Sequence, residues 1–407
     1  MSFQQGLSGL NGAAKSLDVI GNNIANVATV GFKSSRVEFA DIYANSLFGT
    51  GGLQPGIGVQ VAAINQQFSQ GNIAITDNPL DIAINGNGFF LLDDGGARVY
   101  SRNGQFQLDR EGYIVSNTGQ RLMGLTNNTF GPLQIVTFNN APQSTSRIEL
   151  AINLDANAAV PSTAFSHTNP ASYNHTTAMA VYDSLGNAHT LSFYFRRTST
   201  PLQWEVYATV TNTAGATTLL TPTPIGNLSF NADGSLATST ASALTIPATA
   251  LATGANPITL ASGDLDFTGT TQYGAAFGIY SAQQNGYATG QLAGISVADD
   301  GLILGRYTNG QTQTLGQIVL TNFPNPNGLL AIGNNLWVET SASGQPLNPQ
   351  APGSPNLGTL RSGAVEESNV DLTQELVNLI VAQRVYQANA QTIRAQDQVL
   401  QTLVNLR

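Results

Sequence analysis

The residues most suited to metal or acid–base chemistry are few, and their spacing forms no recognisable site. The three histidines, His167, His175 and His189, lack the close spacing of a zinc pair on one helix or strand. We expect them on the surface or in loops. Asp264 and Asp266 offer oxygen ligands for calcium, but the twelve-residue loop with its terminal glutamate is missing. The sequence therefore predicts no metal site.

Adjacent carboxylates and glycine-rich turns also have structural explanations. The acidic pairs at 93–94 and 299–300 precede glycine in turn contexts, and the pair at 366–367 is expected at the start of a helix. The glycine pairs at 56–58 and 86–88 lack the third glycine or the lysine of a phosphate-binding loop. With no converging acid and base, we expect no catalytic residue, no cofactor and no enzyme.

Composition excludes several classes of partner. The chain has 407 residues, a net charge of −9, 10 % charged residues and no cysteine. An acidic surface without lysine or arginine runs argues against nucleic acid, and the absence of cysteine excludes disulfides. The start, MSFQQGLSGLNGAAK, has no basic region followed by an apolar run, and no apolar run approaches the roughly 20 residues that span a bilayer. We expect no cleavable Sec signal and no membrane insertion.

The elements that remain to be explained are the two ends of the chain. At the C-terminus an apolar residue recurs every seven positions, with a companion row four positions later. The first row is Leu372, Leu379, Tyr386, Ile393 and Leu400, and the companion row is Leu376, Ala390 and Val404. At the N-terminus the steps alternate between four and three, at Phe3, Leu7, Leu10, Ala14, Leu17 and Ile24. Both patterns predict helices with an apolar stripe.

Pairing of these two helices does not cover all their apolar residues. The stretch 376–382 is apolar nearly all round, and one partner covers only one face. A helix over 371–407 would be roughly 55 Å long, more than a compact domain accommodates. We therefore predict a self-assembly interface at Phe3, Leu7, Leu10, Leu17, Ile24, Leu372, Leu376, Leu379, Tyr386, Ile393, Leu400 and Leu403. The alternative is a solitary two-helix coiled coil or a core hairpin.

The sequence between the ends is of β type, so the predicted fold is mainly β with α-helical termini that pair as a coiled coil. Short alternating runs end at turn residues, and residues 178–182 and 189–195 flank a probable hairpin turn. The predicted organisation has four parts, with the outer β domain inserted in the inner one. These are a helical core at 1–28 with 364–407, an extended connector at 29–70, an inner β domain at 71–144 with 271–363, and an outer β domain at 145–270.

Local signals at the helix ends give two further expectations. The asparagines within 21–26 compete with the backbone for hydrogen bonds and predict fraying or a bend there. Ser368 or Asn369 is expected to cap the closing helix, with Asp371 at a capping-box distance from Ser368. Glu366 and Glu367 are expected at the positive end of that helix.

Two motifs resemble those of the bacterial flagellar rod, hook and hook-associated axial proteins. The N-terminal stretch LDVIGNNIAN at 17–26, followed by VGFK at 30–33, is similar to the family signature. The C-terminal stretches SNVDL at 368–372 and AQRVYQANAQTI at 382–393 are similar to its closing motif. The matching motif positions include Asn22, Asn23, Asn26, Gly31 and Phe32.

Within the family, the middle of the chain resembles the hook members more than the shorter rod members. The stretches LDIAI at 80–84 and YSRNGQF at 100–106 are similar in both groups, whereas VYDSLGNAH at 181–189 is similar to the hook proteins. In that last motif the matching positions are Asp183, Gly186 and Asn187. The likeness extends over nearly the whole chain and is weakest at about 200–270.

The resemblance implies a structural subunit of the flagellar hook, outside the cell. Such a subunit forms a helical homopolymer, a curved and flexible tube that acts as a universal joint and transmits torque from rod to filament. The implied partners are other copies of the chain, the rod, hook cap and hook–filament junction proteins, and the type III export apparatus.

Three alternatives stay open at this point. The first is a distal rod subunit of the same family. The second is an adhesive or glycan-binding β protein with coiled-coil ends, although Trp204 and Trp337 each lie in a β run and are expected in the core. The third is a hydrolase with carboxylates in the middle block, for which no acid–base pair is found.

Overall fold

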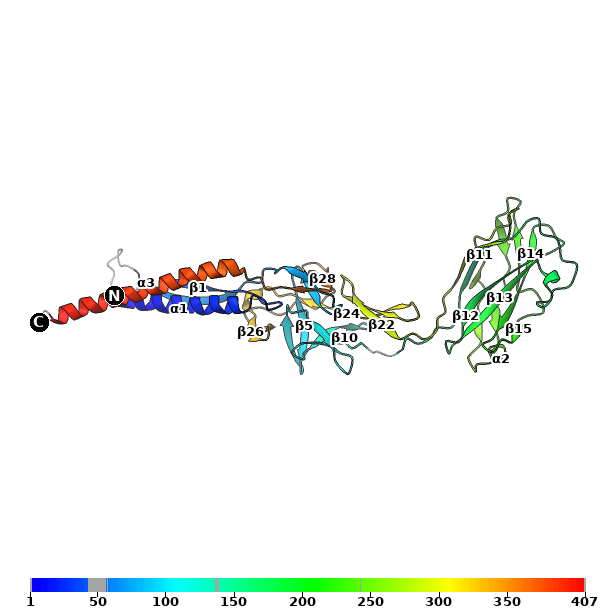
Figure 1. Ribbon diagram of the computed structural model, residues 1–407. Helices are drawn as coiled ribbons and strands as arrows, with labels where there is room; N and C mark the ends of the chain where they lie inside the picture. Colours follow the sequence, from blue (N-terminus) through cyan, green and yellow to red (C-terminus); the bar gives the residue numbers. More distant parts are fainter. Residues whose placement is uncertain (1, 43–55, 57, 136–138, 242, 406–407) are drawn as a thin grey trace. The chain divides into compact units, whose positions relative to one another are not determined.

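The chain folds into two compact units, each described here by itself. The computed structural model describes residues 2–42, 56, 58–135, 139–241 and 243–405 (Figure 1). Unit 1 comprises Met1–Thr137, Gly294–Arg306 and Thr312–Arg407, and unit 2 comprises Phe138–Ala293 and Tyr307–Gln311. Unit 2 is thus inserted in the sequence of unit 1. The four-part division predicted from the sequence, with its boundaries at 28, 70, 144 and 270, stays a prediction.

Two long helices at the ends of the chain pair within unit 1, as the apolar repeats predict. They are α1 (Ser2–Ala25) and α3 (Leu372–Asn405), and Figure 1 shows them side by side. At 34 residues α3 is roughly 51 Å long, and it contains neither glycine nor proline. The predicted combination of a mainly β chain with paired helical termini is confirmed.

The start of α3 differs from the expected cap. Asp371 is the capping residue, because its Oδ1 accepts hydrogen bonds from the backbone N–H groups of Thr373 (2.9 Å) and Gln374 (3.2 Å). Asn369 instead accepts a bond from the backbone of Ser34 (2.8 Å). Glu366 also differs from expectation, since it lies in a strand before the helix and is buried.

A two-stranded sheet follows α1 and packs against it. It consists of β1 (Ser35–Ile42) and β2 (Gly58–Gln66), paired antiparallel. A side chain at Gly12 of α1 would lie 3.2 Å from the ring of Phe39 and 3.6 Å from Val59, so the helix and this sheet are in close contact. The described part of the segment predicted as an extended connector therefore carries these two strands.

The β region of unit 1 contains most of a sheet that has twelve strands within the described residues. Eight of them follow the order β22-β23-β24-β9-β5-β6-β27-β26, and four more attach to this path. Their bounds are β5 (Phe89–Asp94), β6 (Ala97–Ser101), β7 (Phe106–Leu108), β8 (Ile114–Ser116), β9 (Arg121–Thr126), β10 (Thr129–Pro132), β22 (Leu292–Val297), β23 (Leu302–Tyr307), β24 (Thr312–Ile318), β25 (Leu320–Thr321), β26 (Leu330–Gly333) and β27 (Leu336–Val338). A 3-10 turn, η2 (Pro326–Gly328), precedes β26.

Two short strand pairs join the start of the β region to the end of the chain. β3 (Ile73–Ile75) pairs with β29 (Ala364–Glu366), and β4 (Ile82–Asn85) pairs with β28 (Thr359–Ser362). Because these partners are more than 270 residues apart in the sequence, closing unit 1 requires both of its terminal segments.

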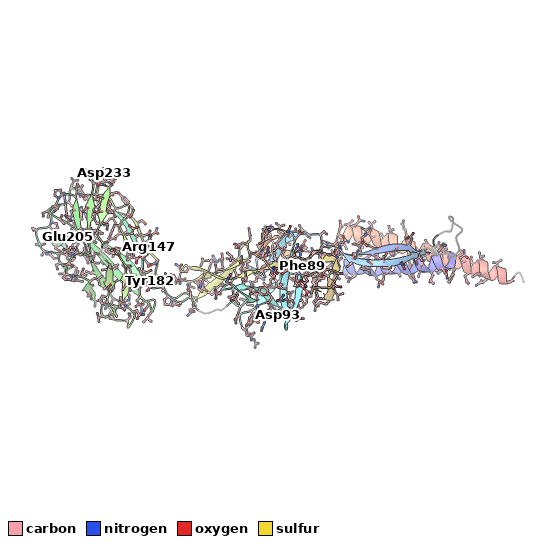
Figure 2. The ribbon with its side chains drawn as sticks, turned by 180° about the vertical axis from the view of Figure 1, so that it is seen from behind. Phe89, Asp93, Arg147, Tyr182, Glu205 and Asp233 are labelled. Atoms are coloured by element: carbon pink, nitrogen blue, oxygen red, sulfur yellow. The ribbon has the colours of Figure 1, made fainter. Side chains whose placement is uncertain are left out.

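Aromatic side chains form a core in unit 1. Phe89, labelled in Figure 2, packs edge-to-face against Phe68, Phe323 and Trp337 at centroid distances of 5.5 to 5.9 Å. This geometry is favourable beyond the area that the rings bury. Trp337 is buried, and so is Trp204 in unit 2, which confirms that both tryptophans are core residues.

Unit 2 has its own core between two sheets. A six-stranded sheet contains β12 (His175–Tyr182), β13 (Ala188–Arg197), β14 (Gln203–Thr211), β15 (Thr217–Leu219), β16 (Gly226–Phe230) and β17 (Leu236–Ser239). A three-stranded sheet contains β11 (Ile148–Asn153), β20 (Leu265–Asp266) and β21 (Gly278–Gln284), and β18 (Leu244–Ile246) pairs with β19 (Ile258–Leu260). Two short turns of helix are η1 (Pro170–Ser172) and α2 (Ala248–Leu251).

Strand alternation explains the centre of unit 2. In β13 the residues Leu191, Phe193 and Phe195 are buried, and they alternate with less buried neighbours. β12 and β13 form the hairpin that the sequence predicts, with Tyr182 opposite Ala188 and His175 opposite Phe195. The predicted hairpin is therefore confirmed.

Candidate assembly interface

Helices α1 and α3 pair in antiparallel directions. They approach each other closely because glycines of α1 face α3. A Cβ at Gly6 would lie 3.2 Å from Ile393, and one at Gly9 would lie 2.9 Å from the side-chain amide of Asn389. At the other end of α1, Asn23 donates a hydrogen bond to Glu375 (3.2 Å). Small residues on one helix therefore let the two backbones approach each other.

The α1-facing stripe of α3 contains only part of the predicted repeat. Ala382 is buried and Leu379 and Ile393 are half-buried. The other predicted positions of α3 are exposed: Leu372, Leu376, Tyr386 and Leu400 have exposed fractions of 37 to 54 %. Leu403 lies in α3, but its side chain falls outside the described residues. Pairing with α1 thus leaves most of this apolar repeat uncovered.

The predicted positions of α1 divide in the same way. Leu10, Leu17 and Ile24 are half-buried, whereas Phe3 and Leu7 near the start of the helix are exposed. Of the twelve predicted positions, five are half-buried and six are exposed, and the twelfth is Leu403.

Further exposed apolar residues on α3 were missed by the heptad rows. They are Val377, Ile380, Val381, Val385 and Val399. The apolar composition of 376–382 on all sides of the helix finds Val377, Ile380 and Val381, whereas Val385 and Val399 lie beyond that stretch. Nearby, the two-stranded sheet exposes Phe39, Val61 and Ile64.

An open groove of about 460 Å³ lies where α1, α3 and the two-stranded sheet meet. Its lining is uncharged and mostly apolar or small, and includes Gly12 and Ala13 of α1, Phe39 of β1, and Val381 and Val385 of α3. Such a lining can accept an apolar side chain but offers no group for catalysis.

The N-terminal motif asparagines join elements instead of fraying the helix. Helix α1 continues to Ala25, so the expected fraying at 21–26 is wrong, and the alternative of a bend there stays a prediction. Asn23 is buried; its side chain donates to the carbonyl of Ser35 (2.9 Å) and accepts from the N–H of Ser35 (2.9 Å). Asn26 donates to Asn22 (2.9 Å to its carbonyl) and accepts from Thr29 (3.2 Å), which closes the helix end.

The glycine and phenylalanine of the same motif lead the chain out of α1. Gly31 has φ +72°, and a side chain there would lie 2.6 Å from the backbone nitrogen of Asn103. Only glycine fits this backbone conformation and this close approach. The N–H of Phe32 donates to the carbonyl of Thr29 (3.2 Å), which makes the turn.

Lys33 of this motif enters a buried ionic cluster that sequence reasoning missed. Its Nζ donates to Oε1 of Glu366 (2.7 Å) and to the carbonyl of Ser69 (2.8 Å). Arg102 donates to Oε2 of Glu366 (3.3 Å), and the three charged side chains are almost completely buried. Burial lowers the pKa of Lys33 from its usual value, and the Glu366 carboxylate opposes that shift.

The middle motif is organised by the buried carboxylate of Asp183. Its Oδ1 accepts from the N–H groups of Leu185 and Asn187 (both 2.9 Å), and its Oδ2 accepts from Thr253 (2.8 Å). Desolvation acts to raise the pKa of Asp183, but the hydrogen bonds from His189, Thr253 and Asn187 together hold it well below its usual range.

The other residues of this motif shape the same turn. Gly186 has φ +85°, and a side chain there would lie 2.8 Å from Pro142. His189 is buried, with Nε2 3.0 Å from Oδ2 of Asp183, so the expectation of a surface position is wrong for this histidine. The ring of His175 stacks on Phe277 at 4.7 Å. These histidines serve packing and turn structure.

No group of three metal-ligating side chains occurs within the described ranges. Asp264 and Asp266 instead accept hydrogen bonds from the backbone of Ala261 and Thr268, as turn residues do. Among these same residues, no helix combines the length and apolar composition of a membrane span.

Comparison with protein families gives four matches that follow one another along the chain. Residues 3–33 match the family described as flagella basal body rod protein, and residues 83–164 match the flagellar hook protein FlgE/F/G D1 domain. Residues 153–287 match the flagellar basal body protein FlaE D2 domain, and residues 361–406 match the flagellar basal body rod FlgEFG protein C-terminal family. The matches include both termini and the middle block.

Curated relatives are similar over their whole length. The flagellar hook protein FlgE of Escherichia coli K12 is 44 % identical over 420 residues, with 100 % of both chains covered. That of Borreliella burgdorferi is 33 % identical, with 100 % of this chain and 99 % of the relative covered. The crystal structure of Helicobacter pylori flagellar hook protein FlgE2 has the same fold, at 15 % identity and a TM-score of 0.51, and covers 72 % of this chain and 100 % of that chain. The chain therefore belongs to the flagellar hook protein family, whose members are structural subunits and not enzymes.

Proposed function

We propose that copies of this chain assemble into the tube of the flagellar hook through the apolar side chains that α1 and α3 leave exposed. The observation that carries the proposal is that Leu376, Val377, Ile380 and Val381 stay exposed on a helix that already has a partner. Contiguous apolar surface of this kind marks an interaction site on a soluble protein. The proposed binding partner is the same helical region of another copy of the chain.

The energetics favour many neighbours over one. Fully burying a leucine or valine side chain contributes about 1.5–3 kcal/mol, whereas association costs several kcal/mol in lost freedom of motion. Exposed apolar residues lie on several sides of α3 and at the start of α1, so a single additional helix would leave part of them in water. Repeated contacts with several copies in a helical polymer bury them all.

The finer role follows from family membership and remains part of the proposal. The polymer is a curved, flexible tube outside the cell that transmits torque between rod and filament as a universal joint. Its partners besides itself are the rod, hook cap and hook–filament junction proteins, and the subunit leaves the cell through the flagellar export apparatus. Unit 2 supports this role because it has few charges and its own core, so its surface can exchange contacts at small cost.

A substitution at Leu376 tests the interface directly. Leu376→Asp places a charge on the exposed face of α3 without touching α1, so tubes should be lost while the subunit stays folded. The matched control is Gln313→Asp, which adds the same charge at an exposed position of β24, outside both helices. Electron microscopy of concentrated protein and circular dichroism of the subunit give the two readouts.

The outcomes separate the proposed function from its alternatives. Curved tubes from the wild type and the control, with none from the Leu376 variant, support the proposal. Normal tubes from Leu376→Asp contradict it, and straight rods from the wild type would favour a distal rod subunit. Saturable glycan binding by the wild type, without any tubes, would favour an adhesive protein.

A further inference from the structure

We propose that Lys33, Arg102 and Glu366 form a latch, a buried cluster of two cations that share one carboxylate, and that this latch lets unit 1 close only when strand β29 has docked. The latch is independent of polymer contacts, because all its members lie inside one unit of one chain. It gives these three charges a role in the order of folding, beyond the role of α1 and α3 in assembly.

Four separate passes of the chain meet at the latch. The N–H of Gly31 donates to the carbonyl of Glu366 (2.8 Å), and the N–H of Gly71 donates to the carboxylate of Glu366 (2.9 Å). Arg102 belongs to the third pass, and its Nη2 also donates to the carbonyl of Gly86 (2.9 Å). The fourth pass contains Glu366 itself. Its carboxylate accepts hydrogen bonds from Lys33, Gly71 and Arg102, one in each of the other three passes.

Asn369 strengthens the same junction from the C-terminal side. Its side chain accepts from the N–H of Ser34 (2.8 Å) and donates to the carbonyl of Gln67 (2.7 Å). The segments that lead from the helices into the sheet are therefore held together by acceptors and donors that arrive with the end of the chain.

Closure of unit 1 depends on the negative charge of Glu366. The buried cluster holds two cations and one anion, and the exposed side-chain fractions are 0 % for Lys33, 4 % for Arg102 and 0 % for Glu366. Without Glu366, two like charges would have to share a water-free site, which is strongly unfavourable. Both cations must then remain in water, and their segments cannot pack.

The positions of these three residues in the sequence determine the order in which their segments can pack. Lys33 and Arg102 lie early in the sequence, whereas Glu366 lies near its end, within β29. The early segments therefore lack their counter-charge until the late strand pairs with β3. An incomplete chain stays open at the junction between helices and sheet.

A purely structural cluster would behave differently when its members are removed. In an ordinary core each substitution adds to the damage, whereas in a latch the removal of both cations relieves the loss of the anion. Three full-length variants distinguish these cases: Glu366→Gln, the triple variant Lys33→Met with Arg102→Met and Glu366→Met, and the control Glu367→Gln. Glu367 is exposed and adjacent to Glu366, so the control makes the same change outside the cluster.

Hydrogen exchange at the amide of Gln67 reports the opening, since this N–H donates to the carbonyl of Ser34 (2.8 Å) and does not involve the C-terminal strand. In the monomer, Glu366→Gln should speed exchange at Gln67 by about a hundredfold or more, and Glu367→Gln should leave it within about threefold. The triple variant should return it to within about tenfold of the wild type. The amide of Leu154 in unit 2, which donates to Thr271 (2.8 Å), should not change in any variant.

Pulse-labelled refolding tests the order itself. In the wild type, Gln67 should become protected in the same phase as Glu367, whose N–H bonds to Asn72 of the β3 segment (2.8 Å), and in the triple variant Gln67 should become protected first. Earlier protection of Gln67 in the wild type overturns the latch, as does slow exchange in Glu366→Gln. If Glu366→Gln fails to fold, a folded triple variant supports the latch and an unfolded one overturns it.

Discussion

At the scale of single residues, the family motifs are places where side chains form hydrogen bonds to distant parts of the chain. Asn23 joins α1 to β1, Lys33 and Glu366 join the two ends of the chain, and Asp183 holds a turn against Thr253. Each is a polar group that is buried and satisfied, so its removal leaves donors or acceptors without partners. Their importance follows from burial rather than from chemistry at a surface.

Lys33 gives unit 1 a specific dependence on pH. Its folded-state pKa lies below the usual 10.5, so the unfolded chain binds more protons and the free energy of unfolding rises with pH toward that value. Lys33→Met removes this rise, and Arg102 still pairs with Glu366 in that variant. We expect a flatter profile than in the wild type as the pH approaches 10.5 from below.

Fluorescence of Trp337 provides the measurement, because the chain has two tryptophans and Trp337 lies in the core of unit 1. Urea unfolding would be followed in a Trp204→Phe background, with and without the Lys33 substitution. Equal pH slopes in the two proteins would contradict the assignment.

Asp183 gives unit 2 a pH dependence of the same sign, but in the acid range. Its pKa is lowered in the folded state, so its contribution to stability is present above about pH 4 and is lost as the pH falls further. Asp183→Asn should cost about 2–4 kcal/mol at neutral pH, since the turn and Thr253 lose a shared acceptor.

The readout is urea unfolding followed by Trp204 in a Trp337→Phe background. Asp233→Asn is the control, because Asp233 is an exposed turn residue, labelled in Figure 2, that bonds only to neighbouring Ser235 within the described residues. A loss no larger in Asp183→Asn than in the control would refute the role of the buried carboxylate.

Sequence reasoning located these residues without finding their roles. The motif at 30–33 and the acidic pair at 366–367 were both visible, but their contact joins positions 333 residues apart, and no local pattern encodes it. Glu366 was therefore placed at a helix start, where adjacent carboxylates are common. His189 was expected at the surface because histidine often lies there, whereas the carboxylate six residues earlier lets it be buried.

At the scale of elements, the spacing of apolar residues along the sequence predicted several helices and strands correctly. The hairpin of β12 and β13, the length of α3 and the pairing of the terminal helices all follow from alternation and apolar repeats. The capping residue of α3 and the end of α1 were not predicted by this spacing. Asn369 and Asn23 bond to distant segments instead of to their own helices. Tertiary contacts override local preference at such positions.

The glycines of α1 provide a matched pair of substitutions for the helix contact. Gly9 faces Asn389, whereas a side chain at Gly21 would meet nothing within 4 Å. Leucine raises intrinsic helix stability by about 0.7–1 kcal/mol at either position. Gly21→Leu should therefore stabilise α1, and Gly9→Leu should separate it from α3 despite the same gain.

Thermal unfolding of the monomer, followed by circular dichroism at a helix wavelength, gives the comparison. A lower helix content for Gly9→Leu than for the wild type, beside an equal or higher one for Gly21→Leu, is the expected result. A stabilised Gly9→Leu protein would show that the close approach of α1 and α3 is not required.

At the scale of the whole molecule, the two units differ in whether they carry the proposed assembly interface. Unit 2 has its own buried core, whereas the exposed apolar residues of both long helices belong to unit 1. A surface change in unit 2 should therefore alter how the tube bends without preventing its formation. Thr238, an exposed residue of β17, is suitable because its side chain is not part of that core.

We expect Thr238→Lys to give tubes of normal yield with changed curvature, since the added charge perturbs contacts between outer surfaces. Electron micrographs of wild-type and variant tubes provide the measurement. Loss of tubes in this variant, with a folded subunit, would show that unit 2 also holds the polymer together.

The unequal lengths of the paired helices have a final consequence. The start of α1 lies near Ile393, but α3 continues to Asn405 and carries exposed Leu400 on the face that α1 covers elsewhere. A subunit built this way has two ends that are not interchangeable, so head-to-tail stacking produces a filament with a fixed polarity. In such a polymer growth and mechanical load have an intrinsic direction, and the last turns of α3, which α1 does not reach, mark one end of each subunit.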